Sequence, residues 1–148
     1  MKISVLGSGS TGNAVLLVAN GTRVLVDAGL SAREIARRMA LLGEDPNSLD
    51  GILLTHEHGD HCGGLRVLIK DLDCPVFISP KTRDAYICES RRPGIPNDES
   101  RRRVDALRDR TVEIDSGRNF QIGKIEPAGN RVNRLTHAHD CRRVDLRL

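Results

Sequence analysis

Residues 56–61 of this chain read His-Glu-His-Gly-Asp-His, so three of the five histidines and two carboxylates lie within six positions. The apolar run 51–54 ends just before this hexapeptide, and Gly63 and Gly64 follow it. Imidazole and carboxylate groups are ligands of zinc and of its first-row neighbours. The alternative is a surface loop that is rich in histidine by chance. The preceding apolar strand, the histidine spacing and the following glycines would then all have to occur together by coincidence. The segment therefore predicts a metal site at the end of a buried strand.

The conformation of the hexapeptide decides where its side chains point. If the segment is extended, successive side chains alternate between two faces. His56, His58 and Asp60 would then point one way and His61 the other. One loop could in this way supply ligands to two adjacent metal positions.

Length and composition indicate a single soluble domain. The chain has 148 residues, which is enough for one domain with a core and too few for two ordinary domains. Its only aromatic residues are Phe77, Phe120 and Tyr86. The core must therefore consist of Leu, Val, Ile and Ala, and stacking platforms for single-stranded nucleic acid are missing.

Charge and cysteine usage restrict the partners and the compartment. A net charge of +3 does not by itself indicate a polyanionic partner. One arginine cluster is interpreted mainly as a solvated face, with phosphate contact as the alternative; it comprises Arg91, Arg92, Arg101, Arg102 and Arg103. The four cysteines show no C-x-x-C spacing, and neither a signal peptide nor a long apolar run is present. We therefore expect reduced thiols in a cytoplasmic protein without a membrane span.

Apolar periodicity and turn residues predict a sheet covered by helices. Strands are expected at 1–6, 14–19, 23–26, 51–54, 75–78, 112–114 and 120–125, and helices at 31–42, 65–72, 80–89 and 101–109. Asn20-Gly21 predicts a hairpin turn, so the first three strands form a β-meander. Ser31 and Glu34 predict a capping box at the start of the first helix. Ser79 followed by Pro80 predicts an N-cap for the helix at 80–89. An exposed loop is expected at 90–100, and no period is visible from Pro127 onward.

Several motifs resemble one known family. Residues 55–61 are similar to the H-x-H-x-D-H signature of metallo-β-lactamase-fold hydrolases, and residues 26–29 resemble the first motif of that family. Residues 6–13 and 27–31 resemble the YycJ/WalJ branch, whose members are associated with exonuclease activity on DNA. The resemblance extends from residue 1 to about Glu126. It implies an α+β fold, namely an αββα sandwich with metals at one edge of its two sheets.

The resemblance also implies roles for individual residues. His56 and His58 would hold one divalent ion, and Asp60 and His61 would hold a second. Asp60 would also be catalytic, because it orients the attacking hydroxide, and Asp27 would steady the ligand loop. Zinc is the expected metal, with manganese or iron as alternatives. Two such cations activate water and polarise the substrate oxygen.

The family pattern is incomplete in this chain. Later ligands are expected from the family, yet only His137 and His139 follow His61. His139 is the candidate additional metal ligand, and a disordered tail is the alternative. The chain resembles about the first half of the family domain, so we expect an incomplete sandwich. Residues 1–126 would be this N-terminal half, and residues 127–148 an atypical tail of a truncated or frame-shifted product.

Three functional hypotheses follow. The first is a metal-dependent hydrolase that uses a metal-activated hydroxide on phosphodiesters, as a DNA exonuclease does. The second keeps the two metals but acts on a thioester, a lactone or a small phosphoester. The third is a truncated, non-catalytic metal-binding fragment. DNA is the expected partner, no membrane partner is expected, and no feature of the sequence indicates an oligomeric state.

Overall fold

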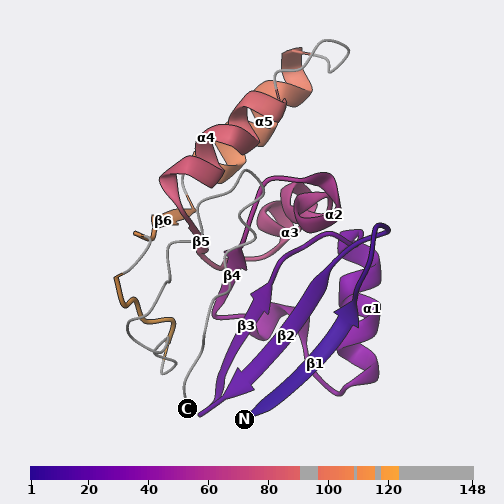
Figure 1. Cartoon of the computed structure of the whole chain (residues 1–148). Coiled ribbons are helices and arrows are strands. Elements are labelled where there is room, and N and C mark those ends of the chain that lie inside the picture. The colour runs from indigo at the N-terminus through magenta and orange to yellow at the C-terminus, as the bar shows by residue number, and fades with distance from the viewer. Residues whose placement is uncertain (91–96, 109, 116–117, 124–148) are drawn as a thin grey trace.

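The computed structural model describes residues 1–90, 97–108, 110–115 and 118–123. Six strands form one sheet in chain order: β1 (Lys2–Gly7), β2 (Ala14–Ala19), β3 (Thr22–Val26), β4 (Gly51–Leu54), β5 (Val76–Ile78) and β6 (Thr111–Glu113). The first three strands are antiparallel, and β3 to β6 are parallel to one another (Figure 1). This mixed architecture confirms the predicted α+β class. Of the expected αββα layers, the described residues contain one sheet and the helices on one of its faces.

The β-meander follows the predicted hairpin signal. Asn20 and Gly21 have φ angles of 51° and 81°. Two consecutive left-handed residues are what a two-residue hairpin turn of the matching twist requires. Ala19 therefore pairs with Thr22 across the turn.

Two of the five helices in the described residues, α1 (Ala32–Leu41) and α4 (Pro80–Ser90), begin at predicted capping residues. The others are α2 (Gly59–Cys62), α3 (Leu65–Asp71) and α5 (Asn97–Arg108), with a 3-10 turn at Pro46–Ser48. The Ser31 hydroxyl accepts a hydrogen bond from the Glu34 N–H at 3.3 Å. The Ser79 hydroxyl accepts from the Thr82 N–H at 3.1 Å. These bonds satisfy backbone donors that a helix start leaves unpaired.

The main core lies between one sheet face and the helices. Ile35 and Met39 of α1 are fully buried, as are Leu16 and Leu25 of the sheet. Figure 1 shows α4 and α5 side by side, projecting beyond the end of the sheet that carries β5 and β6. Leu107 of α5 joins the same core. Aliphatic side chains therefore supply most of this core, as the scarcity of aromatic residues predicts.

The opposite sheet face is also apolar. Its buried centre consists of Leu17, Ala19, Val24, Leu53, Phe77 and Ile122. Ile3 pairs with Leu17 and Val112 pairs with Phe77, so both lie on this face. Ile3 is 58% exposed and Val112 is 42% exposed. The second face is thus covered at its centre and exposed at both margins, in line with the expected incomplete sandwich.

Two predicted elements are wrong in the described residues. Phe120–Gly123 is not a strand, because only Ile122 forms an isolated bridge there. Phe120 and Ile122 instead pack against the second sheet face, which explains their alternation without a ladder. The predicted loop 90–100 is wrong from Asn97, where α5 begins. The exposed ion pair between Asp98 and Arg102, which are one helical turn apart, supports this earlier start.

Other predictions fall outside the described residues. The tail 127–148 is among them, as is the loop segment 91–96. Within the part of the chain that is described, no helix is long and apolar enough to cross a membrane.

The cysteines of the folded chain should differ in reactivity. At about pH 8, iodoacetamide is expected to modify Cys88 and to spare Cys74, because the thiolate is the reactive form. Cys88 is exposed, whereas Cys74 is buried and its burial raises the pKa of the thiol to about 11. Peptide mass mapping before and after unfolding in urea measures the difference. Equal modification of both thiols before unfolding would contradict the described packing.

Candidate metal centre

Three loops meet at one edge of the sheet. Strands β1, β3 and β4 run in the same direction, because β2 is antiparallel to both β1 and β3 and because β3 is parallel to β4. Their carboxyl ends therefore lead into residues 8–13, 27–31 and 55–64 at the same edge. Ligands of open α/β sheets commonly bind outside the carboxyl ends of strands.

Backbone hydrogen bonds join these three loops. The Asn13 N–H donates to the Asp60 carbonyl at 2.7 Å, and the Ala28 N–H donates to the His61 carbonyl at 2.7 Å. The Gly64 N–H donates in turn to the Ala28 carbonyl at 2.7 Å. Each loop is therefore held by its neighbours rather than by its own sequence alone.

The approach of the loops is close enough to require glycine. A Cβ atom on Gly29 would lie 1.8 Å from the Asp60 carbonyl oxygen. A Cβ atom on Gly64 would lie 2.0 Å from the Leu30 carbonyl oxygen. Both neighbours are backbone atoms, so neither overlap can be relieved by a side-chain rotation.

The extended conformation considered for residues 56–61 is wrong in its second half. The chain is extended at His58, but α2 begins at Gly59. The N–H groups of His61 and Cys62 both donate to the His58 carbonyl, at 2.8 and 3.0 Å. A helical turn rotates successive side chains by about 100° rather than 180°. Asp60 and His61 therefore do not point to opposite faces.

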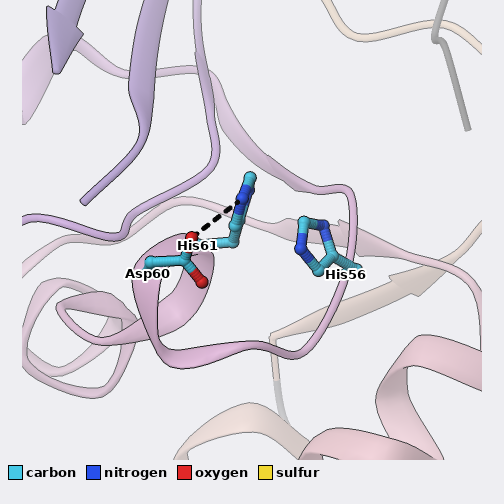
Figure 2. A group of neighbouring side chains, drawn as sticks. All are labelled: His56, Asp60 and His61. Atoms are coloured by element: carbon cyan, nitrogen blue, oxygen red, sulfur yellow. Dashed lines mark ion pairs between the residues drawn. The ribbon is translucent and has the colours of Figure 1, made fainter. Parts of the chain in front are cut away.

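The helical turn brings three potential ligands together (Figure 2). One ligand atom from each of His56, Asp60 and His61 lies within 4.8 Å of the others. The rings of His56 and His61 have centroids 3.7 Å apart, and Asp60 Oδ2 lies 3.5 Å from His61 Nε2. His58 is exposed and lies outside this group, with its ring centroid 5.1 Å from that of His56. Two imidazoles and a carboxylate are a donor set that fits a divalent ion.

Asp27 contacts the Nδ1 side of the His61 ring, opposite the Nε2 atom that faces Asp60. This carboxylate is only 6% exposed, and its Oδ2 lies 2.7 Å from His61 Nδ1. Its Oδ1 also accepts from the Thr55 N–H at 2.9 Å. Because an ionised carboxylate only accepts, Nδ1 must carry the hydrogen. In a neutral His61 ring, the lone pair is then on Nε2, the atom that faces Asp60.

The environment of His56 favours its neutral form. Burial lowers the pKa of this imidazole, and the neighbouring His61 lowers it further. The Thr55 hydroxyl oxygen lies 3.0 Å from His56 Nδ1. A neutral imidazole is the form that binds a metal.

The remaining candidate residues lie outside the described residues or on the exposed surface of α5. His137 and His139 lie outside the described residues, as do Arg91 and Arg92. Of the remaining arginines, Arg101 and Arg102 are exposed and lie one turn from acidic partners on the same helix. Their arrangement matches the solvated-face interpretation of the arginine cluster.

The comparison with known families decides the classification. The model of the metallo-beta-lactamase superfamily matches residues 7–146. The chain belongs to this superfamily. Its members are hydrolases, and the family resemblance drawn from residues 55–61 is thereby confirmed.

Individual members of the superfamily support the same assignment. Exodeoxyribonuclease WalJ of Streptococcus pneumoniae serotype 2 is 42% identical over 84 residues, which cover 57% of this chain and 31% of that protein. Exodeoxyribonuclease YycJ of Bacillus anthracis is 42% identical over 85 residues, covering 57% of this chain and 32% of that protein. The matched part thus spans about a third of the length of these curated relatives. They are the branch that residues 6–13 and 27–31 predict.

A solved structure shows the same fold. A metallo-beta-lactamase of Cronobacter sakazakii superposes with a TM-score of 0.65 at 22% sequence identity. The superposition covers 85% of this chain and 50% of that chain.

Asn13 and Thr55 were not among the predicted site residues. Thr55 directly precedes the first histidine, and Asn13 ends the small, polar loop after the first strand. The predicted β-meander already places that loop at the same edge as Asp27. This topological argument could have indicated Asn13 before the structure was known.

Proposed function

We propose that this chain carries the divalent-metal site of a hydrolase that acts on phosphodiesters, with DNA as the substrate. The observation that carries the proposal is the convergence of His56, Asp60 and His61 at the carboxyl ends of the strands. A second, independent argument is the contact of the buried Asp27 carboxylate with His61 Nδ1. Carboxylates that bind the far nitrogen of a histidine are typical partners of metal ligands.

Within this proposal, two cations are held by four residues. His56 and His58 would hold one ion, and Asp60 and His61 would hold the other. The ring centroids of His56 and His58 lie 5.1 Å apart, so the two imidazoles are neighbours. Zinc is the proposed metal, and manganese or iron would suit the same ligands.

The bound ions would activate the attacking water, and the protein side chains would orient the reacting groups. Bound divalent ions lower the pKa of water and polarise a phosphoryl oxygen. Asp60, which is partly exposed, is the proposed catalytic residue that orients the attacking group. Asp27 holds the His61 ring in the tautomer whose Nε2 is free to bind a cation.

The names of the relatives support a nucleic-acid substrate. WalJ and YycJ are both exodeoxyribonucleases and share 42% identity with the matched part of this chain. A cytoplasmic location is proposed together with this substrate. Among the described residues, Cys74 and Cys88 are free thiols, as a reducing compartment would keep them.

A substrate panel tests the proposed function. Zinc-loaded and manganese-loaded chain is incubated with end-labelled duplex DNA, a thioester, a lactone and a small phosphoester. Shortening of the DNA that stops when a chelator is added supports the proposal. Turnover of only the thioester or the lactone would replace DNA as the substrate. Bound metal without any turnover would support the non-catalytic fragment.

Asp27→Asn should lower the affinity for metal without removing the ligands themselves. The new amide can donate to His61 Nδ1, which moves the ring hydrogen to Nε2 and blocks the lone pair there. Losses of such outer partners typically weaken metal binding by about 10–100-fold. Competition titration with a chromophoric chelator measures the change. Asp45→Asn, at an exposed position on the 3-10 turn, is the matched control. Equal affinity in Asp27→Asn and wild type would contradict the role of Asp27.

A further inference from the structure

We propose that Asn13 is a positioning residue that holds Asp60 and His61 ready for a cation. This inference rests on the proposed function and deepens it. Asn13 lies at the end of the loop between β1 and β2, and its side chain is half-buried. Its Nδ2 atom lies 3.2 Å from Asp60 Oδ2 and 3.0 Å from His61 Nε2.

The orientation of the Asn13 amide follows from its partners. Oδ1 accepts from the Gly9 N–H at 3.0 Å. Nδ2 lies 3.2 Å from the carbonyl oxygens of both Gly9 and Asp60. The reverse orientation would point an oxygen at three oxygen acceptors and an NH₂ group at a donor. The amide nitrogen must therefore face the ligand atoms.

The two ligand atoms need a positive partner between them. Asp60 Oδ2 and His61 Nε2 are only 3.5 Å apart. With the ring hydrogen held on Nδ1 by Asp27, Nε2 presents a lone pair to a carboxylate oxygen. Two such electron-rich atoms repel unless a hydrogen-bond donor or a cation bridges them. The Asn13 NH₂ group is that bridging donor.

The same amide has alternative acceptors once a cation is bound. Its two hydrogens face four acceptors, so not all of them can be satisfied together. When Asp60 Oδ2 and His61 Nε2 bind an ion, the carbonyl oxygens of Gly9 and Asp60 remain as partners. Asn13 can therefore hold the loops in both states. We expect it to favour metal binding by pre-organising the ligands rather than to compete with the ion.

Cobalt binding to Asn13→Ala tests this inference. The backbone bonds of Asn13 to Asp60 and Gly29 do not involve its side chain, so the loops should stay joined. At a temperature where both proteins are folded by circular dichroism, Asn13→Ala is expected to bind Co²⁺ about 10–100-fold more weakly than wild type. Its visible cobalt spectrum is also expected to change. Asn47→Ala is the matched control, because Asn47 is exposed and its side chain bonds only to Asp45 among the described contacts.

The outcomes separate this inference from the proposed function. Unchanged or tighter cobalt binding by Asn13→Ala would overturn the role of Asn13 alone. Failure of the wild-type chain to bind cobalt would overturn the proposed function, and this inference with it. If Asn13→Ala does not fold, the side-chain amide resonance of Asn13 in ¹⁵N-labelled wild type decides. That resonance should shift in step with added Zn²⁺, and an unchanged resonance at full occupancy would overturn the inference.

Discussion

Replacing Gly29 by alanine should destroy the metal centre and strongly destabilise the chain. The added Cβ would lie 1.8 Å from the Asp60 carbonyl oxygen and 2.6 Å from the Asn13 backbone nitrogen. These are the backbone atoms that join the loops, so the strand ends must separate to make room. Overpacking typically costs about 1–3 kcal/mol. We expect the upper end of that range or more, because only backbone movement relieves the overlap.

Thermal unfolding and metal titration together measure this effect. Gly59→Ala is the matched control one residue from Asp60, since a Cβ atom there would meet nothing within 4 Å. Alanine is favoured over glycine in a helix by about 0.5–1 kcal/mol, so Gly59→Ala should be neutral or slightly stabilising. If Gly29→Ala matches the control in both unfolding temperature and metal affinity, the described approach of the three loops is wrong.

Asp60→Ala should abolish tight metal binding while leaving the fold intact. The carboxylate supplies the only oxygen ligand of the described cluster of His56, Asp60 and His61. Its side chain is 35% exposed, so its loss opens no core cavity. Loss of a residue that only hydrogen-bonds to a metal ligand typically lowers metal affinity about 10–100-fold. We expect a larger fall for Asp60→Ala, together with loss of any hydrolysis.

Exposed acidic residues elsewhere provide the control for Asp60→Ala. Asp71→Ala changes the charge by the same amount at the end of α3, away from the three loops. It should retain both metal content and fold. Metal analysis after desalting compares the variants at equal protein concentration. Retention of full metal content by Asp60→Ala would show that the ions are not held by this cluster.

Much of the fold follows from local signals in the sequence. The turn at Asn20-Gly21 and the caps at Ser31 and Ser79 depend on neighbouring residues only, so they were predictable. The prediction of a strand at 120–125 was wrong in its described part, because alternating apolar residues indicate burial rather than strand pairing. Phe120 and Ile122 satisfy that alternation by packing against the sheet.

The candidate site also has a part that the sequence predicts and a part that it does not. The ligand types at residues 56–61 could be recognised from spacing alone. The direction of His61 could not, because it depends on a helical turn at Gly59 that propensity disfavours. That turn is held by bonds from Asn13 and Ala28, which are distant in the chain. Tertiary contacts of this kind leave no local pattern.

Metal analysis of the wild-type chain tests the central claim most directly. The protein is loaded with excess zinc, desalted and measured by atomic emission alongside the Asp60→Ala variant. The proposed four-residue site predicts about two zinc ions per wild-type chain and a clear loss in the variant. Wild-type protein that is folded and yet retains no zinc would contradict the existence of a metal centre at His56, Asp60 and His61.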